Sequence, residues 1–301
     1  METLLSHSFD YLSSTSPQKI RKGLRQVEGL LAQMCLSKTN PANKRQSMLL
    51  LGASTASPKS KKLAELPSDP AFREFFKLQQ SFQWNLAMRL VSCLERLLGK
   101  ESNGTNDLLI IQTLDLIQGV LLLHPPSRAL FSQEIYMNLF LDLLDPSNCP
   151  AIQSSTIMAL VTSLLDQPPN TRTFEAIDGL LVITSLFKSR STSREVKLKL
   201  VEFLYFYLMP ETPAPKMSSS TSATNTAILG GRGKEVIAAF DRRRETVNVP
   251  EGGSKANSSK VDGNIRTTDE KQNLLGKHLS NVQDLVEDLK EGGGVFGVSA
   301  V

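Results

Sequence analysis

The chain has 301 residues, of which 40% are hydrophobic, 21% charged and 6% aromatic, and this composition excludes a fibrous or wholly disordered protein. Its formal net charge of +4 is too small over this length to indicate nucleic acid as the main partner. The three cysteines lie far apart in the sequence, which excludes a disulfide framework and a Cys-x-x-Cys metal site and favours a reducing compartment.

The first 69 residues are predicted to hold a pair of helices followed by a flexible segment. No basic flank and apolar run opens the chain, so we expect a cytosolic or nuclear protein. Helical periodicity predicts helices near Glu2–Leu12 and Pro17–Leu36 within an N-terminal region of residues 1–36. Residues 37–69 carry three prolines and a basic excess, which indicates a flexible basic insertion. Within it, Ser57 precedes a proline and resembles a proline-directed phosphorylation site.

Residues 70–209 are predicted to form an all-α core. Fourteen of the eighteen aromatic residues lie between Phe72 and Tyr207. Asp69 and Pro70 have the residue types of an N-cap and first helical position, and an apolar pattern then runs to Gly99 as one long helix or two with a bend. Apolar spacing predicts further helices at Asp107–Leu123, Ser132–Leu144, Ala151–Leu165, Arg172–Lys188 and Ser193–Met209. No stretch has the alternation of a strand, and none is long and apolar enough to span a bilayer.

An internal repeat sharpens this prediction. A set of five residues recurs after 43 positions: Leu121, Leu122, Pro125, Pro126 and Phe131 are followed by Leu164, Leu165, Pro168, Pro169 and Phe174. In each unit the leucine pair is expected to end a helix, the prolines to break it, and the phenylalanine to start the next layer. Periods of about 40 to 47 residues with two or three helices are typical of armadillo and HEAT solenoids. A helical bundle with one chance resemblance is the alternative.

The last 92 residues, 210–301, are poor in apolar side chains and are predicted to form a disordered tail. Two pieces, Lys234–Arg243 and Asn273–Lys290, have the pattern of transient helices. The second has an amphipathic stripe that includes Leu279 and Val282 and that could dock onto a partner.

The sequence offers no constellation for catalysis. His7, His124 and His278 lie in separate segments without metal-ligand spacing, so no metal or cofactor is expected, and a structural role is expected for His124 at a helix end. The glycine-rich run 230–234 lacks the first glycine and the Ser/Thr of a phosphate loop. We therefore expect no enzyme activity, no direct nucleic-acid binding, and a protein-binding surface. Its candidate anchors are Trp84, Asn85, Arg128, Arg172, Tyr205 and Tyr207.

Four segments carry a resemblance to a known family: Phe82-Gln83-Trp84-Asn85, His124-Pro125-Pro126-Ser127-Arg128, Phe174 to Leu180, and Lys199 to Glu211. Together, over roughly Met1 to Glu211, they resemble the fungal cell division control protein 14 family of the septation initiation network, which is unrelated to the phosphatase of that name. The resemblance implies a noncatalytic subunit that supports a germinal-centre type (Ste20-like) protein kinase at the spindle pole body and division site and promotes septum formation and cytokinesis.

The leading hypothesis is therefore a cytoplasmic regulatory adaptor built as an alpha solenoid. A membrane-tethering helical scaffold, motivated by the basic insertion and the amphipathic stripe of the tail, is the alternative. A hydrolase whose acidic or histidine side chains come from several helices is a third possibility. Neither the oligomeric state nor the binding surface follows from the sequence.

Overall fold

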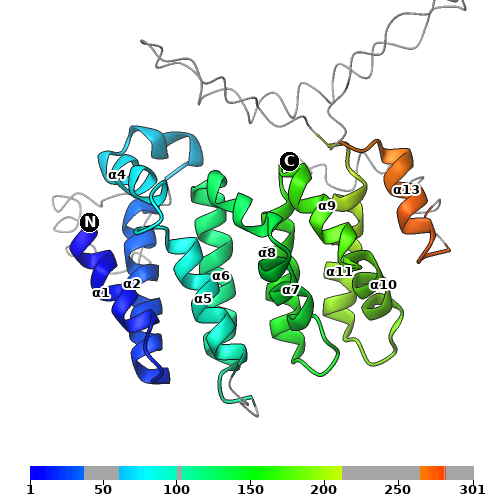
Figure 1. Ribbon diagram of the computed structural model, residues 1–301, viewed down its shortest axis with the longest axis horizontal. Helices are drawn as coiled ribbons and strands as arrows, with labels where there is room; N and C mark the ends of the chain where they lie inside the picture. The colour runs from blue at the N-terminus through cyan, green and yellow to red at the C-terminus, as the bar shows by residue number, and fades with distance from the viewer. Residues whose placement is uncertain (37–60, 100–103, 212–264, 281, 283–301) are drawn as a thin grey trace, which may run out of the picture. The chain divides into compact units, whose positions relative to one another are not determined.

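The computed structural model describes residues 1–36, 61–99, 104–211, 265–280 and 282, and these residues form helices and no β-strand (Figure 1). The all-α prediction is confirmed. The helices are α1 (Glu2–Leu12), α2 (Pro17–Cys35), the 3₁₀ helix η1 (Leu63–Ser68), α4 (Pro70–Gln79), α5 (Leu86–Leu98), α6 (Asp107–Leu123), the 3₁₀ helix η2 (Pro125–Ser132), α7 (Glu134–Leu143), α8 (Pro150–Leu164), α9 (Pro168–Ala176), α10 (Gly179–Lys188), α11 (Arg194–Leu208) and α13 (Thr268–Gly276).

The smaller of two compact units contains, among the described residues, 29–36 and 61–75. The Lys61 amide donates to the carbonyl of Cys35 at 2.8 Å, and the Lys61 ammonium pairs with Asp69. Asp69 also accepts from the Ala71 amide at 2.8 Å, so the predicted cap of α4 is confirmed. The hydrogen bond from Lys61 is the main reason why the pKa of Asp69 lies below its ordinary value. Residues 37–60, with Ser57, lie outside the described residues.

The apolar pattern from Asp69 to Gly99 forms two helices, the second of the two arrangements expected. The chain breaks because Gln79, which is 1% exposed, binds both sides of the following turn. Its Oε1 accepts from the Leu86 amide at 2.7 Å, and its Nε2 donates to the Trp84 carbonyl at 3.0 Å. Asn85 then caps α5, because its side chain accepts from the Met88 amide at 3.0 Å.

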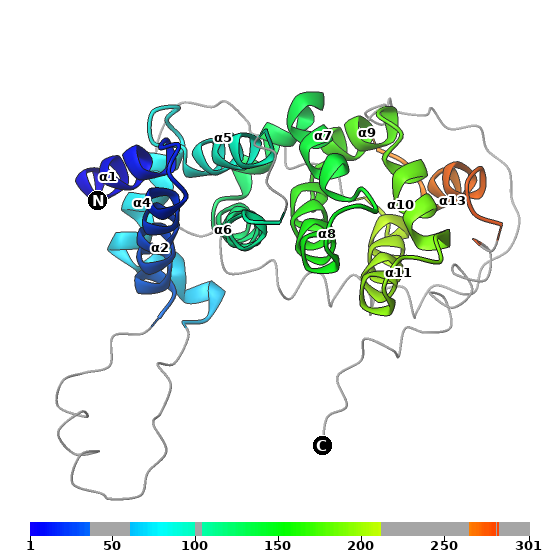
Figure 2. The same cartoon turned by 90° about the horizontal axis from the view of Figure 1, so that it is seen from below.

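Helices of the larger unit pack in the order of the chain. Its described residues are 1–28, 76–99, 104–211, 265–280 and 282. α5 packs against α6, α6 against α8, and α8 against α11, while α7 covers α8 and α10 covers α11. Figure 2 shows α5 and α7 in one row and α6, α8 and α11 in a second row. The unit is thus a series of helical layers, each of which packs against the next.

The prolines of the repeat begin helices. α6 and α8 end just before Pro125 and Pro168, as expected, but each proline is also the first residue of a short helix, η2 or α9, where we expected a longer helix to start further on. Proline is tolerated there because the first helical N–H groups have no partner within the helix. Phe131 and Phe174 lie inside these short helices and are fully buried. The predicted helix Ser132–Leu144 corresponds to α7, with its bounds moved by one or two residues, whereas the predicted helix Arg172–Lys188 is divided between α9 and α10.

The break between α9 and α10 has a local cause. Asp178 adopts a left-handed backbone conformation with φ of 60°. A Cβ at the next residue, Gly179, would overlap the ring of Phe174. That ring packs edge-on against Phe203 of α11, with centroids 5.6 Å apart. The glycine therefore lets α10 begin close against the buried phenylalanine of its own layer.

Part of the predicted disordered tail is a packed helix. α13 begins at Thr267, whose side chain accepts from the Glu270 amide at 3.3 Å while the Glu270 carboxylate accepts from the Thr267 amide at 2.9 Å. α13 packs on α11, and Leu275, Leu279 and Val282 are buried. The expectation of disorder is wrong for residues 265–280 and 282. The predicted helix at 234–243 and the glycine-rich run 230–234 lie outside the described residues.

Candidate functional site

Polar side chains join each layer of the larger unit to the next. Asn85 Nδ2 donates to Ser127 Oγ at 3.4 Å, across 42 residues of sequence. Asn170 is fully buried, and its Nδ2 donates to the carbonyls of Arg128, also 42 residues away, at 2.8 Å and of Ser163 at 2.7 Å. We call Asn85, Ser127, Arg128 and Asn170 the interlayer ladder. Both contacts span 42 residues, one fewer than the sequence repeat of 43, so neighbouring repeats correspond to neighbouring layers.

The side chain of Arg128 adds a further connection between layers. Its side chain is 6% exposed, and its Nε donates to the carbonyl of Leu121 at 3.1 Å. Its Nη1 donates to the carbonyl of Leu165 at 2.9 Å and lies 3.9 Å from the carboxylate of Asp166. Burial lowers the pKa of Arg128, and the Asp166 charge opposes that shift. Arg128 thus binds the end of α6 to the end of α8.

Arg172 makes a similar connection in the last layer. Its guanidinium pairs with Glu211, 39 residues away, and with Glu175 at 3.2 Å. Two cations from the α13 region complete the network: Lys271 Nζ lies 3.0 Å from Glu211, and Arg266 Nε lies 3.1 Å from Glu175. We call Arg172, Glu175, Glu211, Arg266 and Lys271 the terminal clasp. It holds the α13 region on the layer formed by α9, α10 and α11.

Lys271 and Tyr207 make the innermost hydrogen bonds of the clasp, while Arg172 Nε, Arg172 Nη1 and Glu175 Oε2 are buried without a hydrogen-bond partner among the described residues. Lys271 is 3% exposed, and its Nζ donates to the carbonyls of Tyr207 at 2.9 Å and of Met209 at 3.0 Å. Burial lowers the pKa of Lys271, and its bond to Glu211 opposes that shift. The Tyr207 hydroxyl donates to Glu175 at 2.7 Å; burial and this bond raise the pKa of Tyr207. These charges are therefore used in internal contacts.

Most of the predicted anchors have structural roles. Asn85, Arg128 and Arg172 bind neighbouring layers, and Tyr207 is 1% exposed. Trp84 and Tyr205 are half-buried. The sequence held one signal for these structural roles: Ser127 and Asn170, two polar residues of the ladder, are separated by the repeat period of 43 residues and so occupy equivalent positions in successive repeats. Sequence reasoning did not single out Phe82, whose side chain is 74% exposed.

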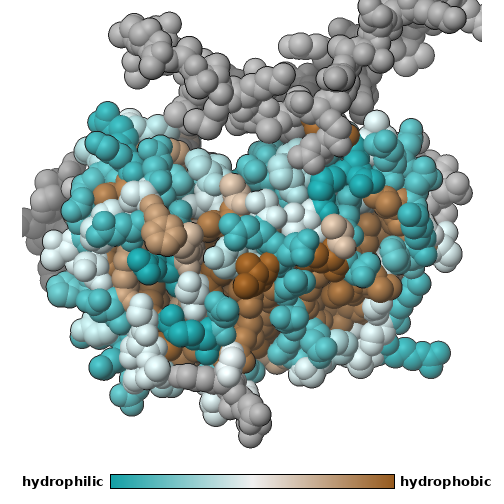
Figure 3. Space-filling view, in the orientation of Figure 1, coloured by the Kyte–Doolittle hydropathy of each residue, from teal (hydrophilic) through white to brown (hydrophobic). Residues whose placement is uncertain are grey.

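Two other surface features lie around α7 and α10. Ile135 and Leu181 are 61% and 46% exposed, and Figure 3 shows apolar surface over these helices. A depression of about 660 Å³ is lined by Leu141, Asp142, Leu144, Asp145, Pro146, Ser147, Asn148, Leu181, Val182, Ser185 and Leu186.

The described residues were also compared with the requirements of a metal site, a reactive thiol and a membrane span. Within residues 1–36, 61–99, 104–211, 265–280 and 282, no three His, Cys, Asp or Glu side chains are grouped so that they could hold a metal ion. Burial raises the pKa of the Cys93 thiol to about 11. In the same part of the chain, no single helix has the length and apolar content of a membrane span; the bent pair of α6 and η2 meets those two criteria only jointly.

The fold and its contacts define a class, a layered all-helical protein whose buried polar side chains connect one layer to the next. The family model described as cell division control protein 14, SIN component, matches residues 1–294, and the chain belongs to this family. It is 29% identical over 298 residues to the cell division control protein 14 of Schizosaccharomyces pombe (strain 972 / ATCC 24843), an alignment that covers 96% of this chain and 94% of the relative. No solved structure matches the chain. The resemblance found in the sequence is confirmed, and it supports a role in the septation initiation network.

Proposed function

We propose that the chain is a non-catalytic adaptor of the septation initiation network that binds a germinal-centre type (Ste20-like) protein kinase, supports its activity, and so promotes septum formation and cytokinesis. The observation that carries the proposal is the interlayer ladder. Buried hydrogen bonds between successive layers fix their relative positions, and a fixed surface loses little entropy when a partner binds. An adaptor that prefers the active arrangement of a kinase would stabilise that arrangement.

The architecture proposed with this function is an armadillo/HEAT-like solenoid. Each of the last two layers has a short proline-initiated helix followed by two longer ones: η2, α7 and α8, then α9, α10 and α11. Three helices in about 40 to 47 residues is the armadillo pattern. The cytoplasm, with recruitment to the spindle pole body and division site, is the proposed location, and Ser57 the proposed phosphorylation site.

The membrane-scaffold alternative has less support. Its amphipathic stripe depends on Leu279 and Val282, which are 8% and 3% exposed because they pack within the larger unit. Side chains used in that way are not available to a lipid surface unless the α13 region detaches.

Reconstitution tests the proposed function. The purified chain is mixed with the kinase of the same network, and complex formation is followed by size-exclusion chromatography and kinase activity by phosphate transfer to a substrate protein. A complex and a raised activity are expected, whereas a kinase of another class should be unaffected. Absence of a complex together with unchanged activity would contradict the proposal.

A further inference from the structure

The turn between α4 and α5 presents an unusually exposed aromatic side chain. Phe82 is 74% exposed, more than any other large hydrophobic residue in the described part of the chain. The exposure is not the result of a loose turn, because Gln79 binds both the Trp84 carbonyl and the Leu86 amide. Asn85 Nδ2 also donates to the carbonyl of Gln79 at 3.2 Å. Residues 80–85, which we call the Phe82 turn, are therefore preorganised, and preorganisation lowers the entropic cost of binding.

A second aromatic residue and a cation lie next to this turn. The ring of Trp84 is 6.2 Å from the ring of Phe9 on α1, and the guanidinium of Arg89 on α5 lies 5.4 Å from that same Phe9 ring. Phe9 is thus in contact with both. Trp84 is half-buried, which leaves part of its indole accessible. Tryptophan and arginine are the residue types that most often dominate the binding energy of protein interfaces.

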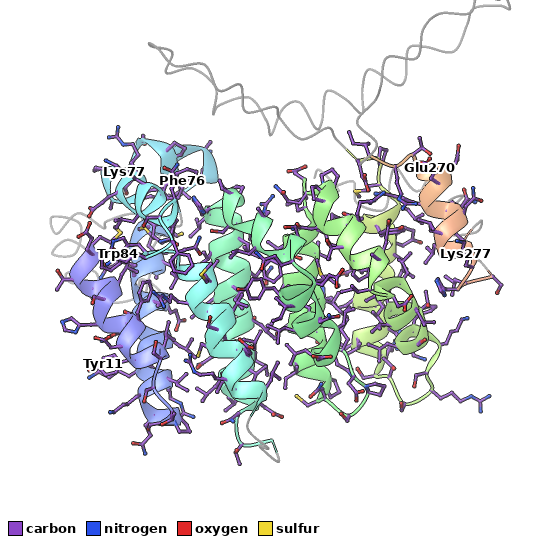
Figure 4. All side chains as sticks on the ribbon, viewed as in Figure 1. Tyr11, Phe76, Lys77, Trp84, Glu270 and Lys277 are labelled. Atoms are coloured by element: carbon purple, nitrogen blue, oxygen red, sulfur yellow. The ribbon has the colours of Figure 1, made fainter. Side chains whose placement is uncertain are left out.

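Arg89 and Lys77, at this end of the larger unit, have no acidic partner among the described residues. Arg89 forms no ion pair with a described carboxylate, and its buried Nε has no hydrogen-bond partner among the described residues. Lys77, in the last turn of α4, is exposed, and Figure 4 places it at the same end of the unit as Trp84. The terminal clasp differs, because each of its cations is paired with a carboxylate. A half-buried arginine that has no carboxylate partner among the described residues and lies beside exposed aromatic surface favours an anionic ligand.

We infer that the Phe82 turn, with Trp84 and Arg89, is the docking surface for an acidic segment of the partner kinase that places an apolar side chain on Phe82 and a carboxylate on Arg89. This inference rests on the proposed function, and it assigns the surface that the function uses. Charge complementarity determines the choice of occupant, because a basic segment would be repelled by Arg89 and Lys77.

Binding measurements with the intact kinase form the first arm of the test. Phe82→Ala removes an exposed ring and leaves the hydrogen bonds of Gln79 intact, so the variant should fold normally. It is expected to weaken kinase binding at least about tenfold, the effect of losing a central aromatic anchor. Arg89→Gln should weaken binding and reduce its dependence on salt. Ile135→Ala, at a similarly exposed residue of α7, is the matched control and should bind as the wild type does.

The second arm of the test measures peptide binding at the Phe82 turn by fluorescence. Trp84 is the single tryptophan of the chain, so tryptophan fluorescence, excited at a wavelength that tyrosine does not absorb, reports on this turn alone. Tryptophan-free 15-residue peptides that tile the kinase outside its catalytic domain are titrated into the full-length chain. An acidic, apolar peptide should shift the emission of the wild type and of Ile135→Ala, and should have at least about tenfold lower affinity for Phe82→Ala. A phosphorylated version of each peptide shows whether phosphate replaces carboxylate.

The outcomes separate the two proposals. If the kinase binds but Phe82→Ala binds equally well, the docking surface is wrong and the adaptor function stands. Emission shifts caused only by basic peptides, by the phosphorylated forms alone or by a second copy of this chain would also overturn the surface as stated. If the kinase does not bind and no peptide shifts the emission, both proposals are wrong.

Discussion

His124 is the buried titratable residue at the end of α6. Its side chain is 1% exposed, Nδ1 lies 2.8 Å from Ser127 Oγ, and its ring meets Phe76 edge-on at 4.6 Å between centroids. Burial disfavours the imidazolium form and lowers the pKa from 6.5 to about 4. The sequence indicated a structural role for this histidine beside the prolines. It could not indicate the burial, because Phe76 comes from a distant part of the chain.

This histidine makes the protein sensitive to acid. As the pH falls below 6.5, His124 becomes protonated in the unfolded chain, but in the folded chain it becomes protonated only near pH 4. The free energy of unfolding is therefore highest above pH 6.5 and decreases between pH 6.5 and about 4. The shift corresponds to a loss of roughly 3 kcal/mol. In His124→Asn, the free energy of unfolding should change less between pH 6.5 and 4, as measured by urea denaturation. His7→Gln, at an exposed position, should keep the wild-type slope. An unchanged slope in His124→Asn would refute this assignment.

At the scale of single elements, α13 is the helix that the sequence described least well. Its apolar content is too low for it to fold alone, and the expectation of a disordered tail followed from that fact. What orders it is the clasp, in which ion pairs and backbone acceptors surround Lys271. Such contacts exist only after α9 and α11 have packed. The local signal that was present, Thr267 and Glu270 as a capping box, gives the start of the helix and no docking position.

Lys271 is expected to control the attachment of α13. Lys271→Met removes one partner of a buried ion pair, and the cost should be about 3 kcal/mol because Glu211 loses a cation inside the protein. Hydrogen exchange of residues 268–276 should become faster while α6 and α8 keep their protection. Lys277→Met is the control: Lys277 is exposed on the same segment, as Figure 4 shows. Equal protection of α13 in both variants would show that the clasp does not hold the helix.

At the scale of the whole molecule, the sequence repeat was the most informative feature. Apolar spacing predicted the all-α fold and the bounds of α6, and the repeat adds an offset of 43 residues that pairs buried positions such as Leu160 with Phe203. It did not predict that each unit divides into three helices, because the left-handed backbone at Asp178 has no signature in apolar spacing. It also suggested partner contacts where the structure has ladder contacts, because arginine suits both roles and only burial distinguishes them.

Asn170 tests whether the ladder stabilises the stack. Asn170→Ala leaves two buried carbonyls, those of Arg128 and Ser163, without this donor, and the free energy of unfolding should fall by about 2 kcal/mol. Faster hydrogen exchange should appear in both η2 and α8, the elements that the side chain joins. Asn138→Ala, an exposed residue of α7, should change stability by less than about 0.5 kcal/mol. Equal stabilities of the two variants would contradict the role of the ladder.

The terminal clasp also bears on how this architecture ends. Arg128 reaches forward along the chain to Asp166, and Arg172 reaches forward in the same way to Glu211, where Arg266 and Lys271 occupy the place of a further repeat. An unfinished last layer would be a template on which another molecule could add, and end-to-end growth of this kind produces filaments. By folding α13 onto α11, the polypeptide itself covers a face of that helix on which another molecule could otherwise add.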